Sequence, residues 1–161
     1  MRRILFVCLG NICRSPTAEA VTRAMAAERG LDLVLDSAGT GDWHLGHPPH
    51  PPMIAAAGRR GYDLRPLRAR QIAPGDFAAF DLILGMDRAN LDGIERLRPA
   101  GSETSVAGFL CPFDPRGTAD VPDPYLTGDF EGALDLIETG AGRLLDQLRA
   151  QTTWAKAPKD S

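Results

Sequence analysis

Residues 4–9, with the sequence Ile-Leu-Phe-Val-Cys-Leu, form an uninterrupted apolar run that includes β-branched side chains. Gly10 and Asn11 end this run, and the Ser15-Pro16 pair that follows is typical of a helix start, with an N-cap residue before a proline at the first helical position. A short apolar run of this kind predicts a strand that is buried on both faces. The chain therefore has to cover both sides of a sheet that contains this strand.

The remainder of the chain alternates strand-like with helix-like segments. Further strands are predicted at residues 31–35, 80–86 and 106–110. Helices are predicted at residues 16–29, 53–60, 88–97 and 129–150, with a helical turn at 76–80 and loops at 37–52 and 111–128. This alternation implies an α/β fold with a parallel sheet and helices on both faces, in which ligands bind beyond the carboxyl ends of the strands.

Length and composition predict one domain, which we assign to residues 1–151, followed by a polar tail at 152–161. The formal net charge of −3 argues against a general nucleic-acid-binding protein, which would normally be basic. Cys8, Cys13 and Cys111 are too few for a disulfide framework and fit a reducing compartment. No segment approaches the roughly 20 apolar residues of a membrane span, so we expect a cytoplasmic protein that does not bind membranes.

The segment from Cys8 to Ser15 joins the first predicted strand to the first predicted helix. Gly10 and Asn11 both tolerate left-handed backbone angles, so this loop can curl with its N–H groups pointing inward. The helix behind it adds the positive end of its dipole, and together they form a cradle for an anion. The residues expected to bind phosphate there are Leu9, Gly10, Asn11, Ile12, Cys13 and Ser15.

Cys8 and Arg14 give this cradle a chemical function. The positive field should favour the thiolate of Cys8, which can attack a phosphorus atom in line. Arg14 offers a planar guanidinium that can hold two oxygens of one phosphoryl group. A cysteine and an arginine separated by five residues are moderately common by chance, but their place between a strand and a helix is far more specific. The alternative is that Cys8 is only a buried strand-end residue and Arg14 an ordinary surface residue.

The sequence VCLGNICRSP at residues 7–16, with Ala-Glu-Ala at 18–20, resembles the signature of the low-molecular-weight protein tyrosine phosphatases. The resemblance covers roughly residues 3–150 and continues through DSAGT at 36–40, ARQI at 69–72, FDLIL at 80–84 and DPY at 123–125. It implies a small, twisted, flavodoxin-like sheet of four parallel strands flanked by helices, with the phosphate-binding loop after the first strand. It also implies an enzyme that hydrolyses phosphotyrosine in proteins through a phosphocysteine, with no metal and no cofactor.

Carried over residue by residue, the resemblance makes Cys8 the nucleophile and Arg14 the phosphate clamp. Asn11 would support the loop geometry, with Ser37 in its hydrogen-bond network, and the Ser15 hydroxyl would stabilise the thiolate. Cys13 would form a reversible disulfide with Cys8 and so protect it from irreversible oxidation, although a small residue that merely fits the loop is an equal alternative.

A phosphomonoester also needs a proton on its leaving oxygen. The segment 111–128 offers Asp114, Asp120 and Asp123, and composition alone does not choose among them. The resemblance selects Asp123, which lies between two prolines, as the general acid and later the general base.

Trp43 and Tyr125 stand in the two loops expected to border the site, and the resemblance makes them the walls of its entrance. A deep slot between them would admit a phenyl phosphate and leave phosphoserine out of reach of the nucleophile. Two departures stand out: the family often has a second tyrosine where this chain has Leu126, and many members have a histidine where it has Leu67. Phosphorylation of a tyrosine pair is therefore in doubt, and the cradle has to be supported differently.

Several other polar residues have simpler interpretations. Asp87 and Asn90 are expected to cap the following helix rather than brace the cradle. Cys111 is expected to be a packing residue. The histidines are expected to be incidental, because the prolines around them forbid a helix: His44, His47 and His50. The arginines at 59, 60, 65, 68 and 70 are expected to form a solvated face rather than a surface that steers acidic phosphopeptides.

Three alternatives compete with a tyrosine phosphatase. An arsenate reductase on the same scaffold needs two further redox cysteines, and only Cys111 lies beyond the cradle. A protein arginine phosphatase of the same fold has a threonine where this chain has Ile12, whose bulk should disfavour a guanidinium group. A non-enzymatic phosphate-binding module would not need the thiol or the facing aspartate. The expected partners are a phosphotyrosine-containing protein, a tyrosine kinase, and phosphate or other oxyanions in the loop.

Overall fold

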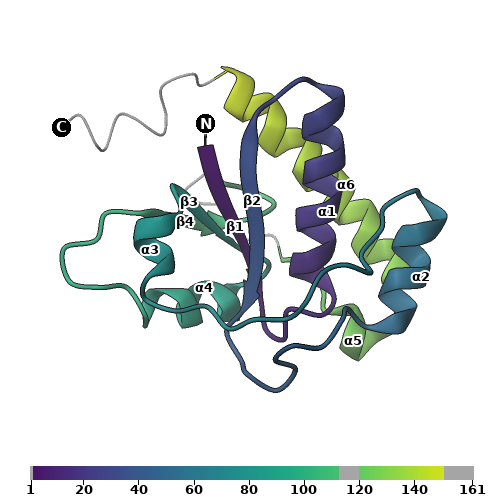
Figure 1. Cartoon of the computed structure of the whole chain (residues 1–161), viewed down its shortest axis with the longest axis horizontal. Helices are drawn as coiled ribbons and strands as arrows, with labels where there is room; N and C mark the ends of the chain where they lie inside the picture. Colours follow the sequence, from purple (N-terminus) through teal and green to yellow (C-terminus); the bar gives the residue numbers. More distant parts are fainter. Residues whose placement is uncertain (1, 113–119, 151–161) are drawn as a thin grey trace.

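The computed structural model describes residues 2–112 and 120–150, and its centre is a four-stranded sheet (Figure 1). The strands are β1 (Arg2–Cys8), β2 (Leu33–Gly39), β3 (Leu82–Gly85) and β4 (Ser105–Gly108). They are ordered β2-β1-β3-β4, and every neighbouring pair is parallel. The predicted α/β fold with a small parallel sheet is therefore confirmed.

Helices cover both faces of this sheet. They are α1 (Arg14–Glu28), α2 (Pro51–Arg59), α3 (Asp76–Ala79), α4 (Arg88–Glu95), α5 (Pro124–Thr127) and α6 (Phe130–Ala150). Figure 1 shows α1, α2 and α6 on one side of the strands and α3 and α4 on the other. No helix within the described ranges is both long and apolar enough to cross a membrane.

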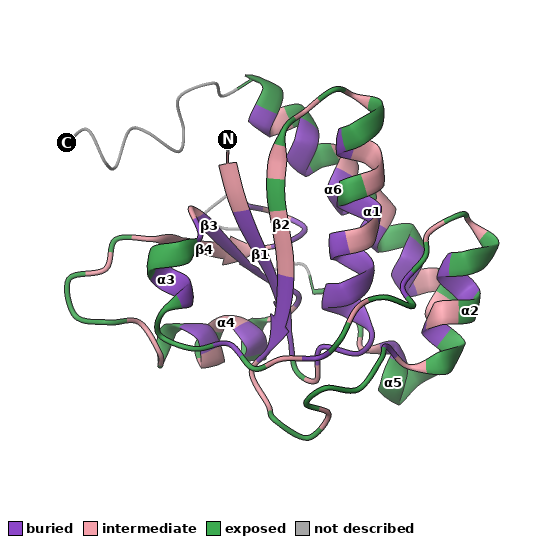
Figure 2. Ribbon diagram, in the orientation of Figure 1, coloured by how far each residue is buried: buried purple, intermediate pink, exposed green. Residues whose placement is uncertain are grey.

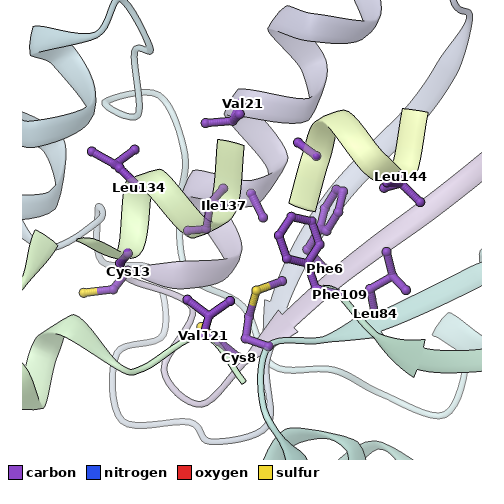
Figure 3. Close-up of a cluster of buried hydrophobic side chains, with 14 of the residues drawn as sticks. Phe6, Cys8, Cys13, Val21, Leu84, Phe109, Val121, Leu134, Ile137 and Leu144 are labelled. Carbon is purple, nitrogen blue, oxygen red and sulfur yellow. The ribbon is translucent and has the colours of Figure 1, made fainter. Parts of the chain in front are cut away.

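Strand β1 explains why the sheet needs both layers. Its residues 4–8 are all buried, and most of the β1 ribbon has the colour of buried residues (Figure 2). Successive side chains of a strand point to opposite faces of the sheet. Ile4 and Phe6 pack in the larger core beneath α1 and α6, whereas Leu5 and Val7 pack in a smaller core beneath α3 and α4. In the larger core the rings of Phe6 and Phe109 meet edge to face at 5.8 Å between centroids (Figure 3).

Two predicted boundaries near the cradle are wrong, and both for the same reason. Helix α1 begins at Arg14, so Ser15 is not its N-cap but lies in its first turn. Strand β2 continues to Gly39, so Ser37 lies in the sheet rather than in the predicted loop. In each case the serine hydroxyl is used in a tertiary hydrogen-bond network, which local helix and loop propensities do not register.

The segment predicted as one loop at 111–128 contains the short helix α5 at its end. Proline at the first helical position and Asp123 before it explain this turn of helix, because the Asp123 carboxylate accepts a hydrogen bond from the Tyr125 N–H. The predicted tail at 152–161 and Asp114 lie outside the described residues.

Candidate active site

The loop after β1 curls around a point at the carboxyl edge of the sheet. Asn11 has a positive φ of 56°, the left-handed conformation that its sequence position predicted. Gly39 of β2 approaches the loop so closely that a Cβ atom there would lie 2.6 Å from the Leu9 carbonyl oxygen. The loop is thus shaped by one left-handed residue and by a neighbouring strand that tolerates no side chain at this position.

The Cys8 thiol lies at the base of this loop in a network of hydroxyl groups. Its Sγ atom is 3.0 Å from the Ser15 Oγ, which also lies 3.3 Å from the Ala38 carbonyl oxygen. The Asn11 amide donates hydrogen bonds to the Ser15 and Ser37 hydroxyls, at 2.8 and 3.0 Å. The Ser15 hydroxyl accepts from Asn11, and its one proton can be donated to the Ala38 carbonyl oxygen or, at the shorter distance, to the sulfur when Cys8 is a thiolate.

A buried carboxylate continues this network. The Ser37 hydroxyl donates to Glu19, which is only 4% exposed and accepts a second hydrogen bond from Arg23. On the other side, the backbone N–H of Arg70 donates to the side-chain oxygen Oδ1 of Asn11. Sequence reasoning missed Glu19 and Arg70 as supports of the loop. Glu19 lies one turn after Ser15, and only the packing of α1 against β2 shows that it reaches Ser37.

Arg14 is 2% exposed, and its guanidinium is held from one side. One terminal nitrogen donates to the Asp87 carboxylate at 2.6 Å and to the Val121 carbonyl oxygen at 3.0 Å. The other lies 3.5 Å from Asp123, and Nε has no hydrogen-bond partner within residues 2–112 and 120–150. Although burial opposes its charge, the adjacent Cys8, Asp87 and Asp123 raise the pKa of Arg14. The guanidinium is therefore a fixed cation with Nε and one nitrogen left for two oxygens of an anion.

Asp87 has two functions at once. As predicted, it caps α4: its carboxylate accepts from the Asn90 N–H, and the Asn90 side chain accepts from the Asp87 N–H. The same carboxylate also holds Arg14, which braces the cradle. The two roles were predicted as alternatives, but Asp87 has both.

A pocket of about 270 Å³ opens above the thiol. Ten residues line it: Cys8, Leu9, Gly10, Ile12, Cys13, Trp43, His44, Asp123, Tyr125 and Leu126. The structure thus brings the predicted nucleophile, acid and aromatic walls together in one cavity. Of the other predicted site residues, Arg14 lies next to Asp123, and Ser15 lies next to Cys8. Asn11 and Ser37 are hydrogen-bonded to each other. Trp43 and Tyr125 are 68% and 52% exposed, as expected for residues at an entrance.

The histidines are more involved in this pocket than predicted. His44 lines it, and a Cβ atom on Gly10 would lie 3.0 Å from the His44 ring. His50 does not line the pocket, but its ring packs on Tyr125 at 5.1 Å between centroids. The only sequence signal for His44 is its place directly after Trp43. Residues 2–112 and 120–150 contain no cluster of three or more histidines, cysteines or carboxylates arranged for a metal ion.

Cys13 is a buried free thiol that lines the same pocket as Cys8. Burial raises the pKa of Cys13 well above its ordinary value, and the nearby charges of Cys8 and Asp123 add to this effect. A raised pKa keeps Cys13 a neutral thiol, beside Cys8, the predicted nucleophile. Cys111 packs at the edge of the larger core and does not line the pocket, in agreement with its predicted packing role.

The run of arginines after α2 is largely neutralised. Arg60 is paired with three carboxylates of α6, from Glu131, Asp135 and Glu138. Arg70 binds Asp36 and Asp76. The predicted solvated face is therefore wrong for these two arginines, which tie elements together instead.

Comparison with known proteins agrees with this geometry. The family model for the low molecular weight phosphotyrosine protein phosphatases matches residues 3–154. The chain is 40% identical over 153 residues to the low molecular weight protein-tyrosine-phosphatase YfkJ of Bacillus subtilis, covering 94% of this chain and 98% of that protein. It is 44% identical over 151 residues to a putative phosphatase of the same class from Synechocystis, covering 91% and 96%.

Solved structures give the same relationship. The crystal structure of YfkJ aligns with a TM-score of 0.85 at 41% identity, over 94% of this chain and 96% of that one. The structure of a Drosophila arginine phosphatase aligns with a TM-score of 0.81 at 29% identity, over 91% and 97%. A family model and relatives that span nearly the whole chain show that it belongs to the low molecular weight protein tyrosine phosphatases and is an enzyme of that class.

Proposed function

We propose that this enzyme hydrolyses phosphotyrosine in phosphorylated proteins through a phosphocysteine on Cys8. The observation that supports this most directly is the convergence of three groups on one pocket: the Cys8 thiol, the half-free guanidinium of Arg14 and the carboxylate of Asp123. A phosphate-binding module would have no use for a thiol and an acid that face each other.

In the first step the Cys8 thiolate attacks phosphorus in line, and the bond between phosphorus and the phenolic oxygen breaks. The loop N–H groups and Arg14 hold the equatorial oxygens, where negative charge is concentrated in the transition state. Asp123 donates its proton to the leaving oxygen, so that tyrosine departs as a neutral phenol. Ser15 donates a hydrogen bond to the thiolate before attack.

In the second step water attacks the phosphorus of the phosphocysteine. The Asp123 carboxylate now takes the proton of this water, and the Cys8 thiolate leaves and regains its hydrogen bond from Ser15. Inorganic phosphate is released, and Asp123 is again protonated for the next substrate. The cycle balances without a metal ion or cofactor.

The walls of the pocket favour an aryl phosphate. Trp43 and Tyr125 would flank the ring of the substrate, while the loop holds its phosphoryl group. The likeness to the Drosophila arginine phosphatase raises phosphoarginine as a second substrate. Ile12 lines the pocket, and its branched apolar side chain offers no polar partner to a guanidinium group. An arsenate reductase is disfavoured because Cys111 does not line the pocket.

The partners follow from this reaction. The substrate is a phosphorylated protein, and the class of enzyme that must supply it is a tyrosine kinase. The product phosphate, like other tetrahedral oxyanions, would occupy the loop above Cys8.

The test is turnover by Cys8→Ser, with Cys111→Ser as the matched control. Cys8→Ser should abolish hydrolysis of a phosphotyrosine peptide while the variant still binds vanadate, because the loop N–H groups and Arg14 remain. Cys111→Ser should retain the wild-type rate. The wild type should hydrolyse phosphotyrosine in preference to phosphoserine and phosphoarginine, and it should not reduce arsenate when a thiol reductant is supplied, all measured with a chelator present. Substantial turnover by Cys8→Ser would disprove the phosphocysteine mechanism.

A further inference from the structure

Four exposed apolar side chains surround the mouth of the active-site pocket. Leu9, Trp43, Tyr125 and Leu126 all line it, and they are 42%, 68%, 52% and 80% exposed. They come from three separate segments, the loop after β1, the loop after β2 and the helix α5. A group of large apolar side chains that the fold leaves in water marks a surface that contacts something else.

The aromatic ring of a phosphotyrosine accounts for only part of this surface. Trp43 and Tyr125 suffice to flank one ring. Leu126 follows Tyr125 in the one-turn helix α5, and successive helical residues point about 100° apart, so the two side chains do not face the same ring. Leu126 is instead available to a group that lies beside the phosphotyrosine.

The charges around the mouth disfavour an acidic neighbour. Among the residues that line the pocket, Asp123 is the only carboxylate and none is lysine or arginine; His44 is the only other titratable side chain besides the cysteines and Tyr125. Arg14 is buried below the pocket and held by Asp87. In the run of arginines that begins at the end of α2, Arg59, Arg60, Arg65 and Arg70 are each paired with a carboxylate. The remaining one, Arg68, donates hydrogen bonds to the carbonyl oxygens of Arg65 and Leu67 and does not line the pocket.

We propose that the enzyme selects phosphotyrosine in an apolar sequence context, and that Leu126 is the specificity-determining residue that contacts the neighbouring apolar side chain of the substrate. This inference rests on the proposed function and specifies its substrate class. The occupant of the apolar mouth is a phosphoprotein segment, because the pocket at its centre is built for a phosphoryl group. An acidic segment is disfavoured, because the described lining of the pocket contains the Asp123 carboxylate and no lysine or arginine.

The test compares three phosphotyrosine peptides that are identical except for the residues on both sides of the phosphotyrosine: two leucines, two serines or two glutamates. The leucine peptide should have a kcat/KM about ten-fold higher than the serine peptide, the effect of partly withdrawing one aliphatic side chain from water. The glutamate peptide should be the poorest substrate. Comparing leucine with serine separates the apolar contact from charge repulsion.

Leu126→Ser should reduce the leucine-to-serine ratio of kcat/KM to near one. Leu136→Ser is the matched control, since Leu136 is an exposed leucine of α6 that does not line the pocket, and it should leave the ratio unchanged. Equal kcat/KM values for the three peptides in the wild type, or an unchanged ratio in Leu126→Ser, would overturn the inference.

Two further outcomes distinguish a failure of this inference from a failure of the proposed function on which it rests. If the wild type hydrolyses no phosphotyrosine peptide at all, the proposed function fails as well. If it hydrolyses all three peptides equally and forms a dimer in sedimentation that Leu126→Ser abolishes, the apolar mouth belongs to a second copy of the chain and the inference is wrong.

Discussion

Asp123 lies where its single carboxylate can serve both steps of the proposed reaction. It lines the pocket, it is 3.5 Å from Arg14, and it is fixed by the N–H of Tyr125. A general acid matters in proportion to how much the leaving group needs a proton. Tyrosine, with a pKa near 10, needs one, whereas a strongly acidic phenol leaves almost unaided.

Asp123→Asn should therefore slow phosphoenzyme formation from phosphotyrosine by roughly 10²–10⁴-fold, the usual contribution of a positioned proton transfer. The loss should be much smaller for an ester of a strongly acidic phenol. Rapid-quench measurement of the phosphoenzyme with both substrates checks this. The variant should also lack the basic limb of the pH–rate profile for this step, because that limb reports loss of the proton of the acid.

Asp120→Asn is the control for this assignment, because Asp120 belongs to the same segment but does not line the pocket. It should retain both the rate and the basic limb. If Asp120→Asn shows the defect and Asp123→Asn does not, the general acid has been misassigned.

If Cys13 protects Cys8 by forming a reversible disulfide with it, the rate of disulfide formation should depend on pH. Peroxide would convert Cys8 to a sulfenic acid, and the Cys13 thiolate would then attack its sulfur to form a disulfide with loss of water. Because burial raises the pKa of Cys13, and the charge of Asp123 adds to this, closure should be slow at neutral pH. Its rate should rise about ten-fold per pH unit while the pH stays below that pKa, since only the thiolate attacks.

The measurement is mass spectrometry of peroxide-treated protein quenched with an alkylating reagent at several pH values. The disulfide should join Cys8 and Cys13, and activity should return with a thiol reductant. Cys13→Ser should recover less activity, and Cys111→Ser should behave like the wild type. Oxidised protein in which Cys8 carries only sulfenic or sulfonic acid would show that Cys13 has no protective role.

At the scale of elements, the start of α4 couples helix stability to the phosphate clamp through Asp87. Asp87→Asn keeps an N-cap acceptor but removes the charge that holds Arg14, whereas Asp87→Ala removes both. Asp87→Ala should therefore lower the free energy of unfolding by about 1 kcal/mol relative to Asp87→Asn. Both variants should bind vanadate more weakly than the wild type, because Arg14 loses its 2.6 Å partner.

Chemical denaturation and vanadate titration of the two variants separate these effects. Asp92→Asn is a suitable control, since Asp92 is an exposed carboxylate of the same helix that is 3.7 Å from Arg88 and does not contact Arg14. If Asp87→Asn binds vanadate as tightly as the wild type, Asp87 is only a helix cap.

The elements could be predicted from the sequence wherever one physical pattern determined them. The apolar run of β1 predicts a strand, and the helically spaced apolar residues of α6 predict a helix, without information from the rest of the chain. Both elements lie where they were expected. The start of α1 was misplaced because Ser15 looks like an N-cap until its hydroxyl is seen to bind Asn11 and Cys8. The end of β2 was misplaced because the segment 37–52 is rich in glycine, proline and histidine, a composition typical of a loop, whereas its first three residues belong to the strand.

For the site as well, the residues of one local motif could be predicted, and the residues that distant segments contribute could not. Cys8 and Arg14 lie in one continuous motif, so the sequence alone places them in one loop. Their supports come from distant segments: Asp87 follows β3, Glu19 lies on α1, and the Arg70 N–H belongs to the segment before α3. Contacts of this kind depend on the packing of whole elements, and no local pattern in a single sequence encodes them.

At the scale of the whole molecule, a protein with a net charge of −3 is proposed to bind a dianion. The cradle would achieve this locally, with the N-terminus of α1, the loop after β1 and a buried arginine. Arg14 is 2% exposed, and its Nε has no hydrogen-bond partner among the residues that the structure describes. An anion that fills the cradle should therefore satisfy buried groups that the folded protein leaves unpaired and that the unfolded chain exposes to water.

Inorganic phosphate should consequently raise the melting temperature. A ligand that binds only the folded state adds about 2.7 kcal/mol of stability at a hundred-fold excess over its Kd, which for a chain of this length corresponds to roughly 5–10 °C. Thermal unfolding followed by circular dichroism measures this shift, with sodium chloride at equal ionic strength as the control. Cys8→Ser should keep the shift, because its loop and Arg14 are intact. Arg14→Lys should lose most of it, because an ammonium group cannot form the two-pronged contact. An equal rise in chloride, or a full shift in Arg14→Lys, would mean that phosphate stabilises the protein elsewhere than in the cradle.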